Sequence, residues 1–364
     1  MKKNLKFILP LIVIGLIISY VIFNGINADK PKIKQIKIGV ILPLTGELSS
    51  LGESAYRGAE LAYQALSPEN QAKIEIIYED DQFDPKNTIA SFNKLTMIDQ
   101  VSAIVCFASN TCNAIAPLAE QNKIPLIAIA SDPKVQENKN YVFRLEIAPA
   151  EEARLLSEYI EINNYQKIAS VVAIQDGIQA GYRELKNMSY FRNHEIFTEN
   201  VNPDEKDFHS VLIKLLNQKP DLIFIGLLPG MAGDLSKQAT ELGYHGNFIG
   251  LNFLQGPETL ATAQGTLEGL VYTFAQDNQD WFNRNYLAKY NQEPGQGSAH
   301  VYDAVNLYFT SIIANKSSSD DFVNYLSTVD NFPGALGNFN SNGQHEFTLP
   351  MRLKTIKNNE YKNY

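Results

Sequence analysis

Cysteine and histidine are scarce in this chain of 364 residues, which has two Cys and five His. The histidines stand far apart in the sequence, at His194, His209, His245, His300 and His345. None of them has the spacing of a zinc motif relative to the two cysteines. The sequence therefore favours neither a structural nor a catalytic metal site, and we expect no cofactor.

Basic residues are also few, with 31 Lys and Arg against 40 Asp and Glu and a formal net charge of −9. Outside the first six residues the chain has no cluster of Lys and Arg. Nucleic acids and anionic membranes are bound through such clusters, because the basic side chains displace counterions. Broad binding to nucleic acid or to an anionic membrane surface is therefore excluded as a main function.

The chain lacks the short motifs of common enzyme classes. It has no Gly-x-Ser-x-Gly elbow, no His-Glu-x-x-His, no P-loop and no dinucleotide fingerprint after its first apolar segment. The acidic run Glu79-Asp80-Asp81 could suggest metal or acid/base chemistry, but we interpret it as the solvated end of a strand. We expect a protein that is not an enzyme.

The first 28 residues have the three parts of an export signal. Three lysines precede the uncharged apolar run 7–23, and polar residues follow it. No Cys follows this run, which excludes a bacterial lipid anchor, and its length just reaches the lower limit for a membrane span. Two outcomes stay open: a signal peptide cleaved near Ala28, which we favour, and an inner-membrane anchor through residues 7–23. Both predict a periplasmic or extracytoplasmic location.

Residues 36–66 have the pattern of a strand, a turn and a helix in succession. Apolar residues are almost continuous over 36–42, as expected for a strand covered on both faces. Pro and Gly in the segment 43–46 end the strand, and alanines then recur at helical spacing as far as Leu66. Ligands of open parallel sheets bind where the strands end, so we expect the turn at 43–53 to face a ligand site.

The same alternation continues along the chain. Further strands are predicted at 74–78, 101–106, 124–130, 141–145, 168–174, 195–197, 221–227, 247–250 and 269–274. Helices are predicted at 85–97, 111–121, 149–162, 181–187, 207–216, 232–242, 281–290, 298–313 and 320–326. This pattern predicts an α/β fold in which one doubly wound architecture is built twice. The segments 334–339 and 347–356, which flank Asn342-Gly343, predict a hairpin.

Several motifs stand in a familiar order. They are Pro43-Leu44-Thr45-Gly46, Arg57-Gly58-Ala59-Glu60-Leu61-Ala62, Tyr78-Glu79-Asp80-Asp81-Gln82, Asp84-Pro85, Ser109 with Ala114 and Pro117, Ile124-Pro125-Leu126-Ile127, Ser131, and Tyr302-Asp303-Ala304-Val305. In order and spacing, residues 36–356 resemble the branched-chain amino-acid-binding (Leu/Ile/Val-binding) type of periplasmic solute receptor. The resemblance implies a class I periplasmic binding protein, with two Rossmann-like lobes joined by a three-strand hinge and a ligand cleft between them.

The resemblance also implies a domain plan and a function. Each lobe should be discontinuous, with lobe one formed by 34–146 plus 274–333 and lobe two by 147–273 plus 334–364. The implied function is capture of a small polar solute, an amino acid or a related carboxylate or amide, and its delivery to an ABC permease by a monomeric protein. The alternative is a ligand-sensing or cell-envelope interaction module of the same fold, anchored by residues 7–23.

The site candidates of lobe one follow two predicted strands: Ala108, Ser109, Asn110 and Thr111 after the third, and Ala130 and Ser131 after the fourth. A helix N-terminus offers free N–H groups that suit a carboxylate, and nearby hydroxyls add donors. Ser109 or Thr111 could instead cap the helix, but the family position of Ser109 favours ligand binding. For Ala130 and Ser131, ligand binding and helix capping both stay open.

Lobe two departs from the amino-acid-binding pattern. The resemblance implies a Tyr where Ile178 or Gln179 stands, a Tyr at Leu227-Leu228, and an acid near Gly250, where the chain has Leu251-Asn252. We therefore take Ile178, Leu228 and Asn252 as site residues. Because a buried ammonium needs a counter-charge, the sequence supports the receptor fold more firmly than it supports an α-amino acid as the ligand.

Two further residues keep alternative interpretations. Asp176 could restore the missing counter-charge or could cap a helix. Tyr302, near the start of the predicted helix 298–313, could line the cleft or pack in the core.

The two cysteines, Cys106 and Cys112, lie close together in the sequence. In an exported protein a disulfide is the default state, provided that the two Cα atoms come within about 7 Å of each other. We predict this bond, with a limited effect on stability because the loop is short.

Overall fold

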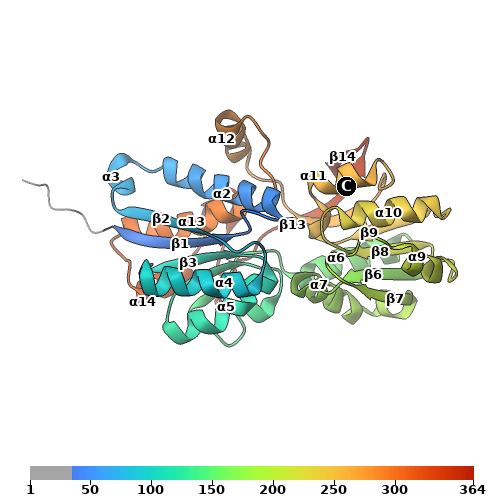
Figure 1. Cartoon of the computed structure of the whole chain (residues 1–364), viewed down its shortest axis with the longest axis horizontal. Helices are drawn as coiled ribbons and strands as arrows, with labels where there is room; N and C mark the ends of the chain where they lie inside the picture. Colours follow the sequence, from blue (N-terminus) through green and yellow to red (C-terminus); the bar gives the residue numbers. More distant parts are fainter. Residues whose placement is uncertain (1–34) are drawn as a thin grey trace, which may run out of the picture. The chain divides into compact units, whose positions relative to one another are not determined.

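The computed structural model describes residues 35–364 (Figure 1), and residues 36–364 belong to one compact unit. The predicted signal peptide or anchor lies outside the described residues. Among residues 35–364, none of the helices combines the length and apolar character needed to cross a bilayer.

Strands and helices alternate along most of the chain. The strands are β1 (Ile36–Leu42), β2 (Ile74–Asp80), β3 (Ala103–Phe107), β4 (Leu126–Ile129), β5 (Val142–Arg144), β6 (Ile168–Ala173), β7 (Glu195–Val201), β8 (Leu222–Gly226), β9 (Asn247–Gly250), β10 (Val271–Ala275), β11 (Phe332–Gly334), β12 (Gly337–Phe339), β13 (Met351–Lys357) and β14 (Glu360–Asn363). The α-helices are α2 (Ser49–Gln64), α3 (Pro68–Gln71), α4 (Pro85–Asn93), α5 (Ser109–Asn122), α6 (Pro149–Ile162), α7 (Asp176–Asn187), α8 (Ser189–His194), α9 (His209–Leu216), α10 (Met231–Glu241), α11 (Pro257–Ala263), α12 (Asp280–Tyr290), α13 (Ser298–Ile313) and α14 (Ser319–Ser327).

Two sheets organise these elements. The first has the order β2-β1-β3-β4-β5 and is parallel throughout. The second has the order β14-β13-β10-β9-β8-β6-β7, in which β10 to β7 are parallel and β13 and β14 are antiparallel additions. The predicted α/β fold with two doubly wound sheets is confirmed.

Helices cover both faces of the first sheet because its central strands are apolar on both sides. Val40 on β1 packs with α2 and α13, and its neighbour Ile41 packs with α4 and α5 (Figure 1). Gly58 lets α2 lie close to α13. A Cβ there would lie 2.0 Å from the carbonyl oxygen of Ser298.

The second sheet has one continuous core. Buried apolar residues of β6, β8 and β9 pack with those of α6, α7 and α10 in a single cluster. Val171, Ile225 and Ile249 are fully buried within it. In both sheets the strands are buried up to their carboxyl ends, where the polar residues begin.

The chain passes between the two sheets three times: after β5, after β10 and before β13. Gln276 N donates to the carbonyl oxygen of Pro350 at 2.8 Å, so the second and third connections lie side by side. The buried Phe339 and Phe347 pack in the core of the first sheet. We therefore propose lobe boundaries of 36–147 plus 276–349 and 148–275 plus 350–364, which assign 334–349 to lobe one.

Two predictions about elements need correction. The predicted hairpin around Asn342-Gly343 is only a short antiparallel turn, with a bridge between Ser341 and Phe347 and a hydrogen bond from Asn342 N to the Glu346 carbonyl oxygen at 2.8 Å. The longer segments that it was expected to join pair elsewhere, in β11–β12 and β13–β14, and the positive φ of Asn358 and Asn359 suits the two-residue turn between β13 and β14. The predicted helix 85–97 is α-helical only to Asn93, and a π-helical turn, Lys94–Ile98, follows it.

Candidate functional site

Three neighbouring strands of the first sheet end in polar residues at the same edge. Phe107 of β3 is paired with Ile129 of β4, and Ala128 of β4 is paired with Arg144 of β5. Two residues further along each strand stand Ser109, Ser131 and Glu146. Because the strands are parallel, these three residues follow one another along the carboxyl edge of the sheet.

The carboxyl ends of both sheets face one cavity. From lobe one it is lined by Leu48, Leu51, Phe83, Phe107, Ala108, Ser109, Ile129, Ser131, Glu146 and Gln296. From lobe two it is lined by Gln175, Leu228, Pro229, Asn252 and Phe253. The cavity therefore has apolar and aromatic walls with a few polar groups, which is the usual composition of a small-molecule site.

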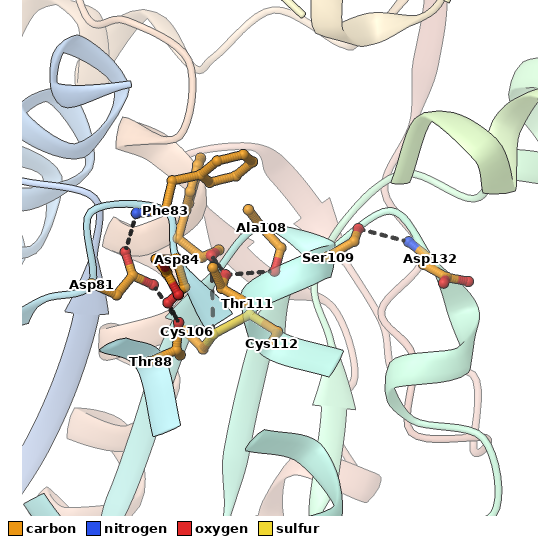
Figure 2. Close-up of a disulfide and its surroundings, with 11 residues drawn as sticks. Asp81, Phe83, Asp84, Thr88, Cys106, Ala108, Ser109, Thr111, Cys112 and Asp132 are labelled. Carbon is orange, nitrogen blue, oxygen red and sulfur yellow. Dashed lines mark hydrogen bonds between the residues drawn. A yellow bond between two sulfur atoms is a disulfide. The ribbon is translucent and has the colours of Figure 1, made fainter. Parts of the chain in front are cut away.

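The N-terminus of α5 is open toward the cavity. Its N-cap residue, Ala108, has φ 76° and ψ 147° and makes no side-chain capping bond. A non-glycine residue in this backbone region is strained and is typically held there for function. Ser109 Oγ accepts a hydrogen bond from the Asp132 N–H at 3.1 Å (Figure 2), so its own hydroxyl hydrogen is available for another acceptor. This helix start presents N–H and O–H donors to a bound group.

A disulfide joins the strand and the helix on either side of this turn. Cys106 of β3 and Cys112 of α5 are bonded, with their Cα atoms 5.7 Å apart, which confirms the predicted pair (Figure 2). Thr111 Oγ1 donates to the carbonyl oxygens of Phe107 and Ala108. Thr111 therefore bonds the local backbone, and the strained turn is fixed on both sides.

Glu146, which is 8% exposed, is a charged residue in a buried setting. Burial alone would raise the pKa of its carboxyl group, but His300, the Ile147 N–H and Arg144 together lower it. Oε1 accepts from Ile147 N at 2.8 Å and lies 3.4 Å from His300 Nε2. Burial would lower the pKa of the His300 imidazole, but the neighbouring Glu146 and Asp303 raise it above its ordinary value. Each member of the pair therefore favours the charged form of the other.

Arg144 extends this charged group behind the cavity. It is fully buried, donates to the carbonyl oxygens of Ala130 and Ile147, and forms an ion pair with Glu346. Burial lowers the pKa of its guanidinium to about 10, so it stays charged. Its guanidinium pairs with Glu346 and its charge also acts on Glu146, although Arg144 itself is not part of the cavity lining.

Lobe two contributes an amide, a backbone turn and an aromatic ring. Gln175 caps α7, and its Oε1 accepts from the Ile178 N–H at 2.9 Å. Asn252 is almost buried, and within the described residues its Oδ1 has no hydrogen-bond partner. A Cβ at Gly177 would lie 2.8 Å from Ser109 Oγ, so the two lobes are in close contact at this point.

The structure brings five of the nine predicted site residues to the cavity: Ala108, Ser109, Ser131, Leu228 and Asn252. The other four, Asn110, Ala130, Ile178 and Tyr302, are absent from its lining. Asn110 Nδ2 lies 3.5 Å from the Phe83 carbonyl oxygen, and the Ala130 carbonyl oxygen accepts from Arg144. Ile178 is fully buried in the core of lobe two.

Tyr302 lies among aromatic rings outside the cavity. Its ring centroid is 5.6 Å from that of Trp281 and 5.2 Å from that of Phe282. Asp176 also lies outside the lining. Its carboxylate accepts a hydrogen bond from Asn113 Nδ2 at 2.9 Å. Neither residue takes the role in the cleft that the sequence left open for it.

Sequence reasoning missed several lining residues, among them Glu146, Gln175 and Phe253. Each of these follows the end of a parallel strand, which is the one signal that could have identified them. The aromatic Phe83, in the loop after β2, shows the same pattern. Treating every strand end as a site candidate would have found all four.

Two sheets whose parallel strands end at one shared cavity are the arrangement of a two-lobed binding protein. The family model described as periplasmic binding protein matches residues 35–360, so the chain belongs to this family. It is accordingly a binding protein, extracytoplasmic by family, and not an enzyme.

One relative in sequence agrees with this assignment, and two solved structures share the fold. An amino acid binding protein of Pseudomonas aeruginosa is 27% identical over 276 residues, which cover 72% of each chain. The structure of a leucine binding protein, LivK, from Thermotoga maritima has a TM-score of 0.84 at 22% identity and covers 90% of this chain and 97% of that one. A solute binding protein of Rhodopseudomonas palustris in complex with 3,4-dihydroxy benzoic acid has a TM-score of 0.80 at 21% identity, with 90% and 95% covered.

Proposed function

We propose that the chain captures a small solute with a carboxylate or amide group in the cavity and delivers it to an ABC permease. The observation that carries this proposal is the open N-terminus of α5, where Ala108, Ser109 and the neighbouring Ser131 line the cavity. Free N–H groups and hydroxyl donors at a helix start favour an anionic oxygen. Binding then draws the two lobes together, and the permease recognises the closed form.

The names of the relatives support this class of ligand. Leucine, amino acids and 3,4-dihydroxy benzoic acid share a carboxyl group and differ in the rest of the molecule. In this chain the rings of Phe83, Phe107 and Phe253 line the same cavity as the serines. A ligand with a polar head and an apolar body fits both features, because the aromatic walls favour burial of apolar surface.

A thermal-shift screen tests the proposal. The exported protein would be melted with amino acids, short amides, peptides and aromatic acids, and each positive compound would be titrated calorimetrically. A ligand that binds only the native state stabilises it by about 2.7 kcal/mol at a concentration of 100 times Kd. At least one carboxylate or amide is expected to raise the melting temperature. A screen in which no compound of these classes binds would contradict the proposal.

The second candidate function is a membrane-anchored sensing or interaction module, and the apolar run 7–23 favours it. N-terminal sequencing of the exported protein separates the two. A chain that begins near Asp29 supports a released solute receptor, and a chain that retains Met1 supports the anchored module.

A further inference from the structure

The described residues that line the cavity carry charge of one sign, which is negative. Among the described residues that line it, Glu146 is the only one with a charged side chain, and none is Lys, Arg or His. A negative group at one position thus shares the cavity with hydroxyl and N–H donors at another. A simple carboxylate would meet the donors but would bring no donor to the Glu146 carboxylate.

One oxygen of Glu146 remains available. Oε1 is the atom that accepts from Ile147 N and faces His300 Nε2. Within the described part of the chain, Oε2 takes no hydrogen bond and is not among the fully buried unpaired atoms. A donor that enters the cavity therefore finds a carboxylate oxygen whose partner position is open.

The other acids close to the site are already engaged. Glu152 Oε1 accepts from Asn252 N at 3.2 Å and from Thr273 Oγ1 at 2.7 Å, and burial raises the pKa of this carboxyl group to about 7. Asp176 accepts from Asn113 at the edge of the lobes. The position near Gly250, where an acid was expected, carries Asn252. Glu146 is thus the acid that is both charged and open to the cavity.

We propose that Glu146 is a specificity-determining residue, which selects ligands that carry an ammonium or similar cationic donor beside their carboxylate. The proposal deepens the function proposed above and rests on it. It follows from the order of the strand ends: Ser109 and Ser131 present hydroxyl donors, and Glu146, the next position along the same edge, presents an acceptor. This arrangement has one pole for each end of a zwitterion, and the aromatic walls receive an apolar side chain.

The alternative is that Glu146 serves only to hold His300, as a buried structural pair. In that case the cavity would not discriminate between a ligand with an ammonium group and the same molecule without it. Matched ligand pairs therefore separate the two roles directly.

The first experiment uses the unmodified protein and calorimetric titration. Each α-amino acid with an apolar side chain is paired with its deaminated acid, such as leucine with 4-methylpentanoate and phenylalanine with 3-phenylpropanoate. We expect the ammonium-bearing member to bind about ten- to a hundredfold tighter, since a charged hydrogen bond is at stake. Equal affinities within the pairs, or a panel in which no ammonium-bearing member binds, overturn the proposal.

The second experiment uses Glu146→Gln, with Glu120→Gln as the control. Glu120 also accepts backbone N–H bonds, from Asn140 and Tyr141, but lies at the far end of α5. Glu146→Gln should lose about ten- to a hundredfold in affinity for the amino acid and little for the deaminated acid, whereas Glu120→Gln should change neither. An equal loss for both ligands would assign Glu146 a structural role. If Glu146→Gln fails to fold, the ligand pairs on the unmodified protein still decide.

These outcomes separate this inference from the function on which it rests. If an ammonium-free carboxylate or an amide binds as tightly as the amino acids, the role of Glu146 fails while solute capture stands. If no small solute binds at all, both fail.

Discussion

Ser109 and Ser131 face the cavity from neighbouring strand ends, but their hydrogen bonds differ. Ser109 Oγ accepts from the Asp132 N–H, whereas the hydroxyl of Ser131 makes no hydrogen bond within the described residues. Truncation of Ser109 would therefore leave a buried N–H group unpaired as well as removing a donor from the cavity. Ser131 is the cleaner probe of ligand binding.

We expect Ser131→Ala to weaken binding of a carboxylate ligand roughly ten- to a hundredfold, or by about 1.5–3 kcal/mol, because a hydroxyl bond to a charged group is lost. The ligand-free protein should unfold at an unchanged urea concentration. Ser109→Ala should weaken binding and also lower stability by about 1–3 kcal/mol. Calorimetric titration and urea unfolding measure both effects, and full affinity in Ser131→Ala would place the carboxylate elsewhere.

Glu152 makes stability depend on pH. Burial raises its pKa from 4.5 to about 7, so between these values the native state holds a proton that the unfolded chain has released. The native state then binds more protons than the unfolded state, and stability falls as pH rises through this window. Below pH 4.5 this carboxyl group does not lower the free energy of unfolding, and above pH 7 it lowers it by its full amount.

Glu152→Gln replaces the carboxyl group with a neutral group of the same shape. The variant should be more stable than the unmodified protein at pH 8, on the order of 1–3 kcal/mol, and close to it at about pH 5. Urea unfolding at the two pH values measures the difference. A variant that loses stability equally at both would show that Glu152 is ionised in the folded protein.

At the scale of elements, the turn from β3 into α5 combines a strained residue with a covalent brace. Ala108 holds its positive φ between a buried strand and a helix that the Cys106–Cys112 bond joins. A short disulfide loop limits the unfolded chain only modestly, by about 2 kcal/mol in the loop-entropy model. Its larger role is therefore to hold the donors of the helix start in place.

Replacement of both cysteines by Ala should lower the free energy of unfolding by about 2 kcal/mol and weaken ligand binding at the same time, since the strained turn can then relax. Unfolding and titration of the variant, with the reduced unmodified protein beside it, measure the two effects. Binding that stays unchanged in a folded variant would show that packing alone holds the turn.

The start of α7 approaches the start of α5 across the cavity. Gly177 is the residue at the contact, and a methyl group on it would meet Ser109 Oγ at 2.8 Å and the ring of Phe253 at 3.0 Å. Its φ is not in the left-handed region, so the requirement for glycine is spatial.

Gly177→Ala should weaken ligand binding by about 1–3 kcal/mol, the usual cost of overpacking, because the lobes can no longer come together fully. Stability without ligand should change little, since the lobes can separate slightly to relieve the contact. Titration and thermal unfolding of the variant distinguish these effects. Full affinity in Gly177→Ala would mean that this contact is not part of the bound state.

At the scale of the whole molecule, polar contacts join the lobes on either side of the cavity. Asn113 Nδ2 donates to Asp132 of lobe one at 3.2 Å and to Asp176 of lobe two at 2.9 Å. Ser50 of lobe one donates to Glu258 of lobe two. In the closing motion that we propose, these contacts favour the closed form.

Asn113→Ala should reduce ligand affinity by about 0.5–1.5 kcal/mol, the net value of a hydrogen bond. It should also raise the radius of gyration of the ligand-free protein in X-ray scattering, because a smaller fraction of the molecules adopts the closed form. Asn122→Ala is the control, since Asn122 lies on the same helix and, among the described residues, its side chain donates to the carbonyl oxygen of Leu118 in that helix. Equal affinities for the two variants would remove this contact from the closing mechanism.

The sequence by itself determined the fold and part of the site. Apolar strand segments such as 36–42 alternate along the chain with segments of helical periodicity, and this alternation predicts a doubly wound α/β fold. Such a prediction is possible because the periodicity of a strand or helix is a local property of the sequence. The strand ends follow directly from these patterns. Ser109, Ser131 and Asn252 each stand just after such an end, so the linear order of residues is enough to place them at the edge of a sheet.

Only the tertiary structure decided which strand ends meet. Glu146, Gln175 and Phe253 are far apart in sequence, and their convergence depends on sheet register and on the packing of two lobes. The same packing takes Ile178 into a core and Tyr302 into an aromatic cluster, although both stand at helix starts. A local pattern shows where a side chain can be polar or apolar, but long-range contacts determine what it faces.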